Sequence, residues 1–151
     1  MSSVNPKKSE KFFGYAKKMS VKSQFHRAPF GCVVVYKNKV IGSGINAYKS
    51  NPVQAKYNKH REFDESNGSY IRSSIHAEVS ALYPLIDNMD IDWKKVDIYI
   101  YRKCKSREHG MARPCPACMQ LIKDLGIKNI HYTTDDGFAH ERIWKTTPCE
   151  K

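Results

Sequence analysis

The sequence lacks several features that would place it in a specialised class of protein. No apolar run among its 151 residues is long enough to span a membrane, and the first residues have no apolar signal-peptide core. It has no internal repeat, linker or low-complexity segment. Its five cysteines are an odd number with a single C-x-x-C pair, which argues against a secreted disulfide framework. We therefore expect a cytoplasmic protein whose cysteines serve a metal or redox site.

The remaining composition is that of an ordinary globular chain with excess positive charge. A length of 151 residues, with 40% hydrophobic and 27% charged residues, predicts a single domain over residues 1–151. The 26 Lys and Arg outnumber the 15 Asp and Glu, which gives a net charge of +11. This charge favours anionic partners such as nucleotides, RNA or single-stranded DNA, but a basic solvated surface without a partner explains it equally well.

The first half of the chain predicts one helix, two strands and a long connection. Apolar residues at helical spacing predict a helix over residues 7–20. A β-branched run over residues 32–36 predicts a buried strand, and residues 40–46 predict its partner, with two glycines that indicate close backbone approach. Residues 47–74 have no clear periodicity and form either a substrate-facing loop or a solvated insertion.

The middle of the chain predicts a helix, a strand and a basic loop. Apolar spacing predicts a helix over residues 76–86, and Pro84 indicates that this helix bends or ends early. Residues 96–101 alternate enough to predict a third strand. Residues 102–113 are basic and irregular.

The last part of the chain predicts a helix and two strands. Pro114 or Pro116 suits the first turn of a helix that ends at Gly126, and residues 128–133 predict a fourth strand. A tight-turn sequence at residues 135–137 predicts that residues 138–144 return as an antiparallel fifth strand, with a short helix as the alternative. This order of elements predicts an α/β fold with three layers, α/β/α, around a mixed five-stranded sheet.

Two short segments carry the side chains best suited to chemistry. Cys115 and Cys118 have C-x-x-C spacing at a predicted helix start, where the helix dipole helps to hold them as thiolates. His76 lies in the first turn of another predicted helix. If both helix starts point at one spot, His76, Cys115 and Cys118 can bind Zn²⁺ and leave a fourth position for water.

Glu78 lies two residues after His76, also in the first turn of its helix. There, both side chains can project toward the same end of the helix, one onto the metal and the other beside its water. A carboxylate in that place can take a proton from the water, whose pKa the metal lowers, and pass it to a leaving group.

Two other interpretations of the cysteine pair remain open. A redox pair is weakened because Pro114-Cys115 does not follow a strand in the βαβ pattern of thioredoxin-like motifs. A purely structural zinc needs a fourth ligand. The candidates for that ligand are Cys104, His109 and His60.

The two segments resemble the H-x-E…P-C-x-x-C signature of the zinc-dependent cytidine deaminase-like superfamily. The matching residues are His76-Ala77-Glu78 and Pro114-Cys115-Pro116-Ala117-Cys118. Upstream, residues 28–35 resemble the P-x-G-A-V strand entry of these enzymes, and residues 40–46 resemble their second strand. The resemblance covers residues 25–134 and implies the cytidine deaminase-like fold.

The resemblance also implies a reaction and a set of site residues. The reaction is hydrolytic deamination of a nucleobase, in which water replaces the ring amine and ammonia leaves. The implied zinc ligands are His76, Cys115 and Cys118; the proton shuttle is Glu78; the substrate contacts are Asn46, Phe30 and Ala77. Related enzymes are usually homo-oligomers, so a homo-oligomer is expected.

The expected substrate is a small nucleoside or nucleotide, and a deoxycytidylate-like compound is the first choice. Residues 51–57 resemble an insertion of phage-type and deoxycytidylate deaminases, and the positive charge favours a phosphorylated substrate. Four cations in the basic loop could bind that phosphate or be solvated: Lys103, Lys105, Arg107 and Arg113. An antiparallel fifth strand also favours free nucleosides or nucleotides over tRNA or DNA.

Three alternatives remain. Pro29-Phe30-Gly31 also resembles guanine deaminases, which keeps a purine substrate open. A polynucleotide deaminase would use the basic surface to hold RNA or single-stranded DNA. A non-enzymatic, zinc-stabilised binding module would not need the carboxylate of Glu78.

Overall fold

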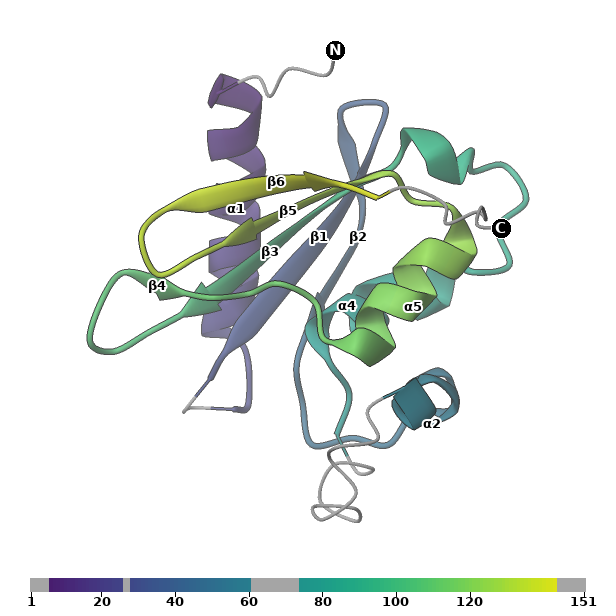
Figure 1. Cartoon of the computed structure of the whole chain (residues 1–151), viewed down its shortest axis with the longest axis horizontal. Helices are drawn as coiled ribbons and strands as arrows, with labels where there is room; N and C mark the ends of the chain where they lie inside the picture. Colours follow the sequence, from purple (N-terminus) through teal and green to yellow (C-terminus); the bar gives the residue numbers. More distant parts are fainter. Residues whose placement is uncertain (1–5, 26–27, 61–73, 144–151) are drawn as a thin grey trace, which may run out of the picture.

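One mixed sheet organises the part of the chain that the computed structural model describes, residues 6–25, 28–60 and 74–143 (Figure 1). The strand order is β2-β1-β3-β5-β6, and the two-residue β4 pairs with β3. The strands are β1 (Phe30–Tyr36), β2 (Lys39–Ile45), β3 (Asp97–Lys103), β4 (His109–Gly110), β5 (Asn129–Thr133) and β6 (Phe138–Arg142). β3 and β5 are parallel, whereas β1 is antiparallel to both β2 and β3.

Helices cover both faces of the sheet. The helices are α1 (Pro6–Val21), α2 (Pro52–Tyr57), α4 (Ala77–Leu82) and α5 (Pro116–Leu125), with short 3₁₀ turns η1 (Asn58–His60), η3 (Tyr83–Leu85) and η4 (Trp93–Lys95). α1 lies behind the sheet in Figure 1, and α4 and α5 lie in front of it. The predicted three-layer α/β/α fold is therefore confirmed. Within the described ranges, no helix has the length and apolar content needed to cross a membrane.

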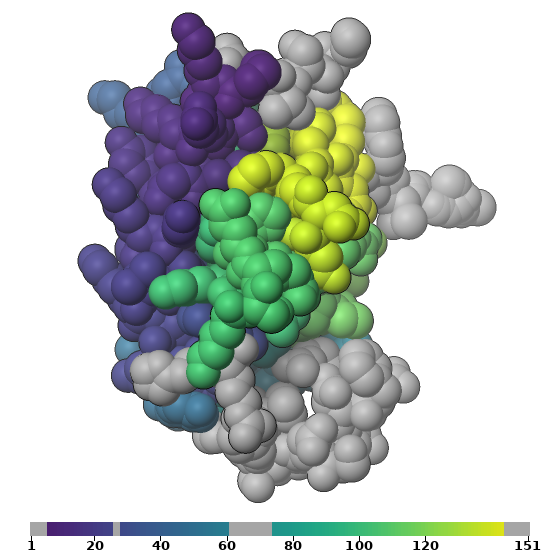
Figure 2. Space-filling model, turned by 90° about the vertical axis from the view of Figure 1, so that its left-hand side faces the viewer, coloured from purple at the N-terminus to yellow at the C-terminus, as the bar shows by residue number. Residues whose placement is uncertain are grey.

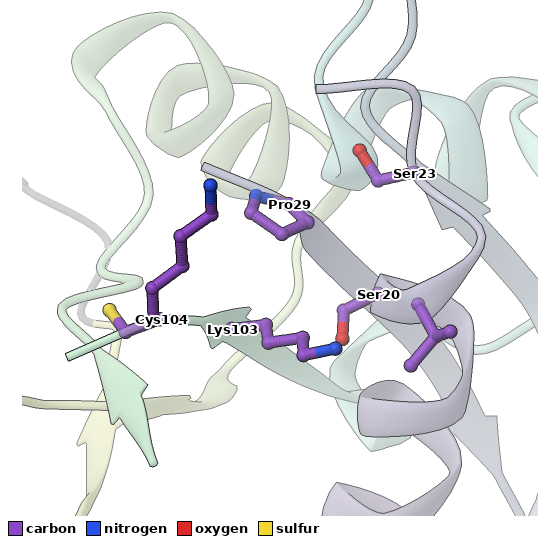
Figure 3. Close-up of a pocket in the computed structure, with 7 residues that line it drawn as sticks. Ser20, Ser23, Pro29, Lys103 and Cys104 are labelled. Carbon is purple, nitrogen blue, oxygen red and sulfur yellow. The ribbon is translucent and has the colours of Figure 1, made fainter. Parts of the chain in front are cut away.

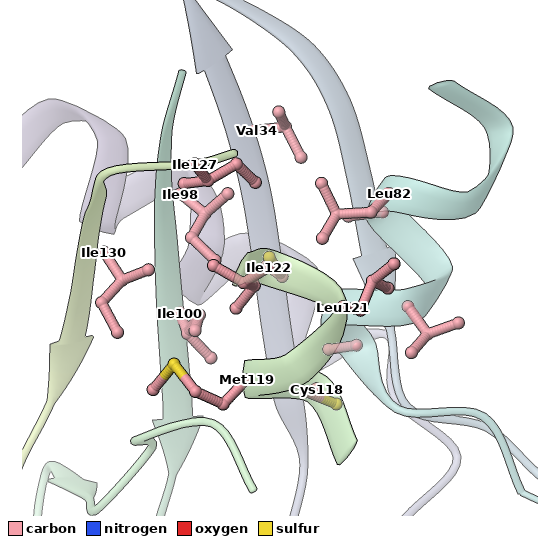
Figure 4. Close-up of a cluster of buried hydrophobic side chains, with 14 of the residues drawn as sticks. Val34, Leu82, Ile98, Ile100, Cys118, Met119, Leu121, Ile122, Ile127 and Ile130 are labelled. Carbon is pink, nitrogen blue, oxygen red and sulfur yellow. The ribbon is translucent and has the colours of Figure 1, made fainter. Parts of the chain in front are cut away.

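The alternation of side chains along β1 separates two apolar cores. Val33 and Val35 face α1 and pack in a cluster with Phe12 and Phe13. Their neighbour Val34 faces the opposite way, into the larger core under α4 and α5 (Figure 4). That core joins sheet residues to helix residues, namely Val34, Ile98, Ile100 and Ile130 to Leu82, Leu121 and Ile122. Each fully buried Leu or Ile stabilises the fold by roughly 1.5–3 kcal/mol.

Most of the predicted elements are confirmed, including three whose position depends on one local signal: the strand β6 and the ends of the helices α4 and α5. β6 pairs antiparallel with β5 after the turn at residues 135–137, which excludes the short-helix alternative. α4 ends at Leu82 and continues as the 3₁₀ turn η3, which contains Pro84. α5 ends at Gly126, whose φ of 97° is a left-handed conformation that glycine adopts without strain.

Two segments that the sequence predicted as irregular contain short elements. α2 and η1 lie within residues 47–74, where Asn51 caps α2 by accepting hydrogen bonds from the backbone N–H groups of Val53 and Gln54. β4 lies within residues 102–113 and pairs with the end of β3. Elements of two to six residues are too short to show a periodic apolar pattern. The remainder of the long connection, residues 61–73, lies outside the described residues.

The hairpin of β3 and β4 packs beside α1 and β6, as the green, purple and yellow surfaces of Figure 2 show. Phe138 of β6 lies between Phe13 of α1 and His109 of β4, with ring centroids 4.5 and 4.9 Å apart. Nδ1 of His109 also lies 2.7 Å from the carbonyl oxygen of Thr134. The contacts of His109 fix the end of the loop between β3 and β4.

Gly44 of β2 lies where α4 packs closely against the sheet. A Cβ atom at Gly44 would lie 2.5 Å from the backbone nitrogen of Ala81 and 2.6 Å from the backbone oxygen of Ala77. We predict that Gly44→Ala lowers the free energy of unfolding by about 1–3 kcal/mol, because the helix must shift. Urea denaturation measures this change. Gly14→Ala in α1 is the control, since no atom lies within 4 Å of its added Cβ; equal stability of the two variants would contradict the prediction.

Candidate active site

Two helices begin at the same place on one face of the sheet. His76 is the N-cap of α4 and Cys115 is the N-cap of α5, and both have extended backbones, with ψ of 157° and 168°. Neither side chain caps its own helix. Pro116 follows in the first turn of α5, where the missing backbone N–H costs nothing. The sequence therefore starts each helix one residue after a potential metal ligand.

Three side-chain donors converge at these helix starts. Nδ1 of His76 lies 3.3 Å from Sγ of Cys118 and 3.5 Å from Sγ of Cys115. All three atoms lie within 4.8 Å of one another. In a tetrahedral zinc site with Zn–N of about 2.0 Å and Zn–S of about 2.3 Å, neighbouring N and S ligands lie about 3.5 Å apart. The donor set and its spacing therefore fit a zinc ion.

No fourth residue completes this group in the part of the chain that the structure describes. Only His76, Cys115 and Cys118 form a cluster of metal-binding side chains there. The three candidates for a structural fourth ligand lie elsewhere: Nδ1 of His109 contacts the carbonyl oxygen of Thr134, Cys104 lines another pocket, and the ring of His60 lies beside that of Tyr57. Three protein ligands with one open position are typical of a catalytic zinc site.

The cysteine pair lies where a thiolate is stabilised. The pKa of Cys115 is lowered to about 3, first by a hydrogen bond with Cys118 and then by the hydrogen bond and charge of His76, which together outweigh the effect of burial. The thiolate is the form that binds a metal. The described cysteines form no disulfide. Ligand chemistry therefore accounts for this pair without a redox role.

Glu78 points its carboxyl group into the same cluster from the first turn of α4. Glu78 is only 4% exposed. Burial raises the pKa of Glu78 to about 7; the charge of Cys115 adds to this, while His76 and a hydrogen bond with Cys118 oppose it. The carboxyl group is thus within reach of the three donors and shielded from bulk water.

A pocket of about 200 Å³ opens over this cluster. Six of the seven predicted site residues line it, namely Phe30, Asn46, His76, Ala77, Glu78 and Cys115. The seventh, Cys118, is fully buried behind the pocket wall. We call this cavity the reaction pocket. The two distant sequence motifs and the hairpin upstream therefore meet in one place.

The side chain of Asn46 already has structural partners. Its Oδ1 accepts a hydrogen bond from the backbone N–H of Phe30 at 3.0 Å and another from the hydroxyl of Ser23. Its Nδ2 donates to the carbonyl oxygen of Ala28 at 2.8 Å. Asn46 thus fixes the entry of β1 beside the pocket, and a direct substrate contact through its second N–H stays a prediction.

A positioning role for Gln54 of α2 was missed at the level of sequence. Gln54 is 1% exposed, and its Oε1 accepts the backbone N–H of His76 at 2.9 Å. Its Nε2 donates to Asn58 at 2.8 Å, which fixes the amide orientation. Next to this contact, Ala47 and Ile75 form an antiparallel β-bridge with two reciprocal backbone hydrogen bonds. Part of the long connection therefore holds His76, the first candidate zinc ligand, in place. The sequence signal that could have revealed α2 was Asn51-Pro52, a helix cap followed by a first-turn proline.

We predict that Gln54→Leu weakens zinc binding about 10–100-fold, because the backbone of His76 loses its support. The N–H of His76, whose contact is partly buried, would also lose its acceptor, at a cost of about 1–3 kcal/mol in unfolding free energy. Competition with a chelating dye and urea denaturation measure the two effects. Gln24→Leu is the matched control, since Gln24 accepts the backbone N–H of Tyr48 in an exposed position. Equal zinc affinity in both variants would refute the role of Gln54.

Arg113 and Glu141 form a second arrangement that the sequence did not reveal. Arg113 lines the reaction pocket one residue before Pro114, and its Nε and Nη2 donate to the two carboxylate oxygens of Glu141, both at 2.9 Å. Tyr132 also donates to Glu141 at 3.1 Å. The antiparallel strand β6 thereby holds the segment that leads to the cysteines.

Most of the chain matches a known protein family. Residues 6–134 match the family model described as the cytidine and deoxycytidylate deaminase zinc-binding region. The chain belongs to this deaminase family. Its cofactor is zinc, and its His-Cys-Cys group is positioned to bind the ion. A search of curated proteins finds no match.

Solved structures show the same fold at low sequence identity. The dCMP deaminase of cyanophage S-TIM5, solved with dCMP and dUMP, is 18% identical, with a TM-score of 0.60 over 87% of this chain and 85% of that one. The cytidine deaminase of Burkholderia pseudomallei is 18% identical, with a TM-score of 0.58 over 88% and 91% of the two chains. The cytidine deaminase-like fold implied by the sequence motifs is confirmed.

Proposed function

We propose that this protein catalyses zinc-dependent hydrolytic deamination of the nucleobase of a small nucleoside or nucleotide, with a deoxycytidylate-like substrate first. The observation that carries the proposal is the convergence of His76, Cys115 and Cys118 with the carboxyl group of Glu78 at the wall of one pocket. Three ligands, an open position and an adjacent acid-base group are what hydrolytic deamination requires.

Each residue has a distinct part in the proposed reaction. His76, Cys115 and Cys118 hold the zinc ion, which when bound supplies a Lewis acid that makes water nucleophilic near neutral pH. Glu78 takes one proton from the attacking water and delivers it to the ring nitrogen; it then transfers the remaining proton of the added hydroxyl to the departing amine. The water oxygen bonds to the amine-bearing ring carbon, the C–N bond breaks, and ammonia leaves.

Three residues are proposed to position the base. Phe30 contributes an aromatic wall that a flat base can contact, and the guanidinium of Arg102 covers that ring at 5.6 Å from its centroid. Asn46 and the backbone at Ala77 offer polar groups at the pocket wall. The volume of about 200 Å³ is below the range of drug-sized ligand sites, which supports a substrate of which only the base enters.

Support for a nucleotide comes from the fold and the charge. A dCMP deaminase, solved with dCMP and dUMP, has a similar fold, and the net charge of +11 favours a phosphorylated ligand. A guanine-type purine and a flipped-out base in tRNA or single-stranded DNA are the alternatives on the same site. Cytoplasmic location, homo-oligomeric assembly and a single domain over residues 1–151 stay predictions.

Ammonia release from zinc-loaded protein tests the proposal. The panel contains cytosine, adenine and guanine as free bases, nucleosides and nucleoside monophosphates, together with a short oligonucleotide. We expect turnover of dCMP or deoxycytidine to exceed that of every purine. Activity confined to guanine compounds would show that the substrate is a purine and not a pyrimidine. Activity confined to the oligonucleotide, with steep salt dependence, would indicate a polynucleotide deaminase.

A further inference from the structure

A second pocket lies directly beside the reaction pocket and has a different chemical character. Its volume is about 350 Å³, and Figure 3 shows it between the end of α1, the entry of β1 and the loop after β3. Its principal lining residues are Ser20, Ser23, Pro29, Lys103, Cys104 and Lys105. We call it the lysine pocket. Among the residues that the structure describes, no carboxylate lines it.

The structure separates the four cations of the basic loop into two kinds. Arg107 pairs with Asp135 at 2.9 Å, and Arg113 pairs with Glu141 at 2.9 Å. Lys103 and Lys105 have no carboxylate partner among the residues that the structure describes, and both line the lysine pocket. Two uncompensated positive charges in one cavity favour an anion.

Among the described side chains that line the lysine pocket, the two ammonium groups are the strongest hydrogen-bond donors. The hydroxyl of Ser20 already donates to the carbonyl oxygen of Lys17 at 2.6 Å, and the hydroxyl of Ser23 already donates to Asn46. The side chain of Lys103 extends toward Ser20 in Figure 3. Each ammonium offers three donors to an acceptor with several oxygens, and lysine is a common partner of phosphate.

The lysine pocket and the reaction pocket share a wall. Pro29 lines one and the next residue, Phe30, lines the other. Ser23 lines the lysine pocket and hydrogen-bonds to Asn46 of the reaction pocket. The backbone N–H of Lys103 donates to the carbonyl oxygen of Pro29 at 2.9 Å, which ties the basic loop to this wall.

We propose that the lysine pocket binds a phosphate group of a nucleotide, through Lys103 and Lys105, next to the pocket that receives the base. The phosphate belongs either to the substrate or to a second nucleotide bound beside it. That the phosphate belongs to a nucleotide rests on the proposed function, whereas the binding of phosphate rests only on the charge and shape of the cavity.

Protection of Cys104 from alkylation tests phosphate binding without any need for turnover. Cys104 lines the lysine pocket and is partly exposed. Zinc-loaded protein is treated with a maleimide with or without inorganic pyrophosphate, and peptide mass mapping follows the labelling of Cys104. We expect pyrophosphate to slow this labelling about tenfold in the native protein and not in the Lys103→Gln, Lys105→Gln double variant, because each lost charge-assisted contact weakens binding.

The Lys94→Gln, Lys95→Gln double variant is the matched control, because it removes the same two charges from exposed lysines before the opposite end of β3. The proposal is overturned if pyrophosphate does not protect Cys104, or if the Lys103→Gln, Lys105→Gln variant is protected as well as this control. If pyrophosphate protects Cys104 but the protein deaminates no compound of the panel, the lysine pocket binds phosphate and the proposed reaction is wrong.

Kinetics then identify which nucleotide carries the phosphate. If it is the substrate, the double variant raises the KM for dCMP about tenfold and leaves the KM for deoxycytidine unchanged. If it is a second nucleotide, dCMP still protects Cys104 when excess deoxycytidine fills the reaction pocket. Protection by an oligonucleotide alone, with none by pyrophosphate or dCMP, would contradict the assignment to a small nucleotide.

Discussion

Replacement of Glu78 by glutamine is expected to abolish most deamination while zinc stays bound. Glutamine has nearly the same shape, so α4 and the donors of His76, Cys115 and Cys118 keep their positions. It cannot accept and return a proton at this place, and general acid-base groups contribute roughly 10²–10⁴-fold to rates. We therefore expect kcat to fall by about that factor in Glu78→Gln.

Two measurements on the same sample separate this effect from a folding defect. Metal analysis by mass spectrometry is expected to give the same zinc content for Glu78→Gln as for the native protein. Ammonia release at saturating substrate gives kcat. Glu10→Gln, an exposed change in α1, is the matched control and is expected to keep full activity. A Glu78→Gln protein that retains native kcat would remove Glu78 from the reaction.

Replacement of Cys115 by serine is expected to lose the metal and the activity together. A serine hydroxyl at neutral pH is a far poorer zinc ligand than a thiolate. Loss of an indirect supporting contact already costs about 10–100-fold in metal affinity, so loss of a direct ligand is expected to cost more than about 100-fold. Because zinc binds the folded chain, its loss also lowers the midpoint of thermal unfolding.

Cys104→Ser makes the same chemical change outside the donor group and serves as the control for Cys115→Ser. Cys104 is partly exposed and lines the lysine pocket rather than the reaction pocket. The control is expected to keep one zinc per chain, and a chelator is expected to lower its unfolding midpoint to the level of Cys115→Ser. One zinc per chain in Cys115→Ser, held with native affinity, would show that Cys115 is not a ligand.

The sequence was most informative where one residue controls a local conformation. Pro84 ended α4, Gly126 ended α5, and the turn at residues 135–137 sent β6 back beside β5. The H-x-E and C-x-x-C motifs were equally useful, because each motif starts a helix, and both helix starts meet on one face of the sheet. The site could therefore be assembled from local signals and one family resemblance.

The contacts that the sequence did not reveal join residues that are distant along the chain. Gln54 lies 22 residues before His76, and Arg113 lies 28 residues before Glu141. No spacing rule links such pairs, since their meeting depends on how the whole sheet brings the elements together. The same reason explains why the basic loop could not be divided in advance into arginines that pair with a carboxylate and lysines that have no carboxylate partner in the described part of the chain.

The separation of the three donors along the chain has a consequence for folding kinetics. His76 is 39 residues from Cys115 and 42 from Cys118, and the intervening chain contains β3, the strand between β1 and β5. Contacts that close such long segments carry a large entropic cost and tend to form late. An interaction absent from the folding transition state slows unfolding without accelerating folding. Zinc is therefore expected to lengthen the lifetime of the folded sheet and to leave its rate of formation unchanged.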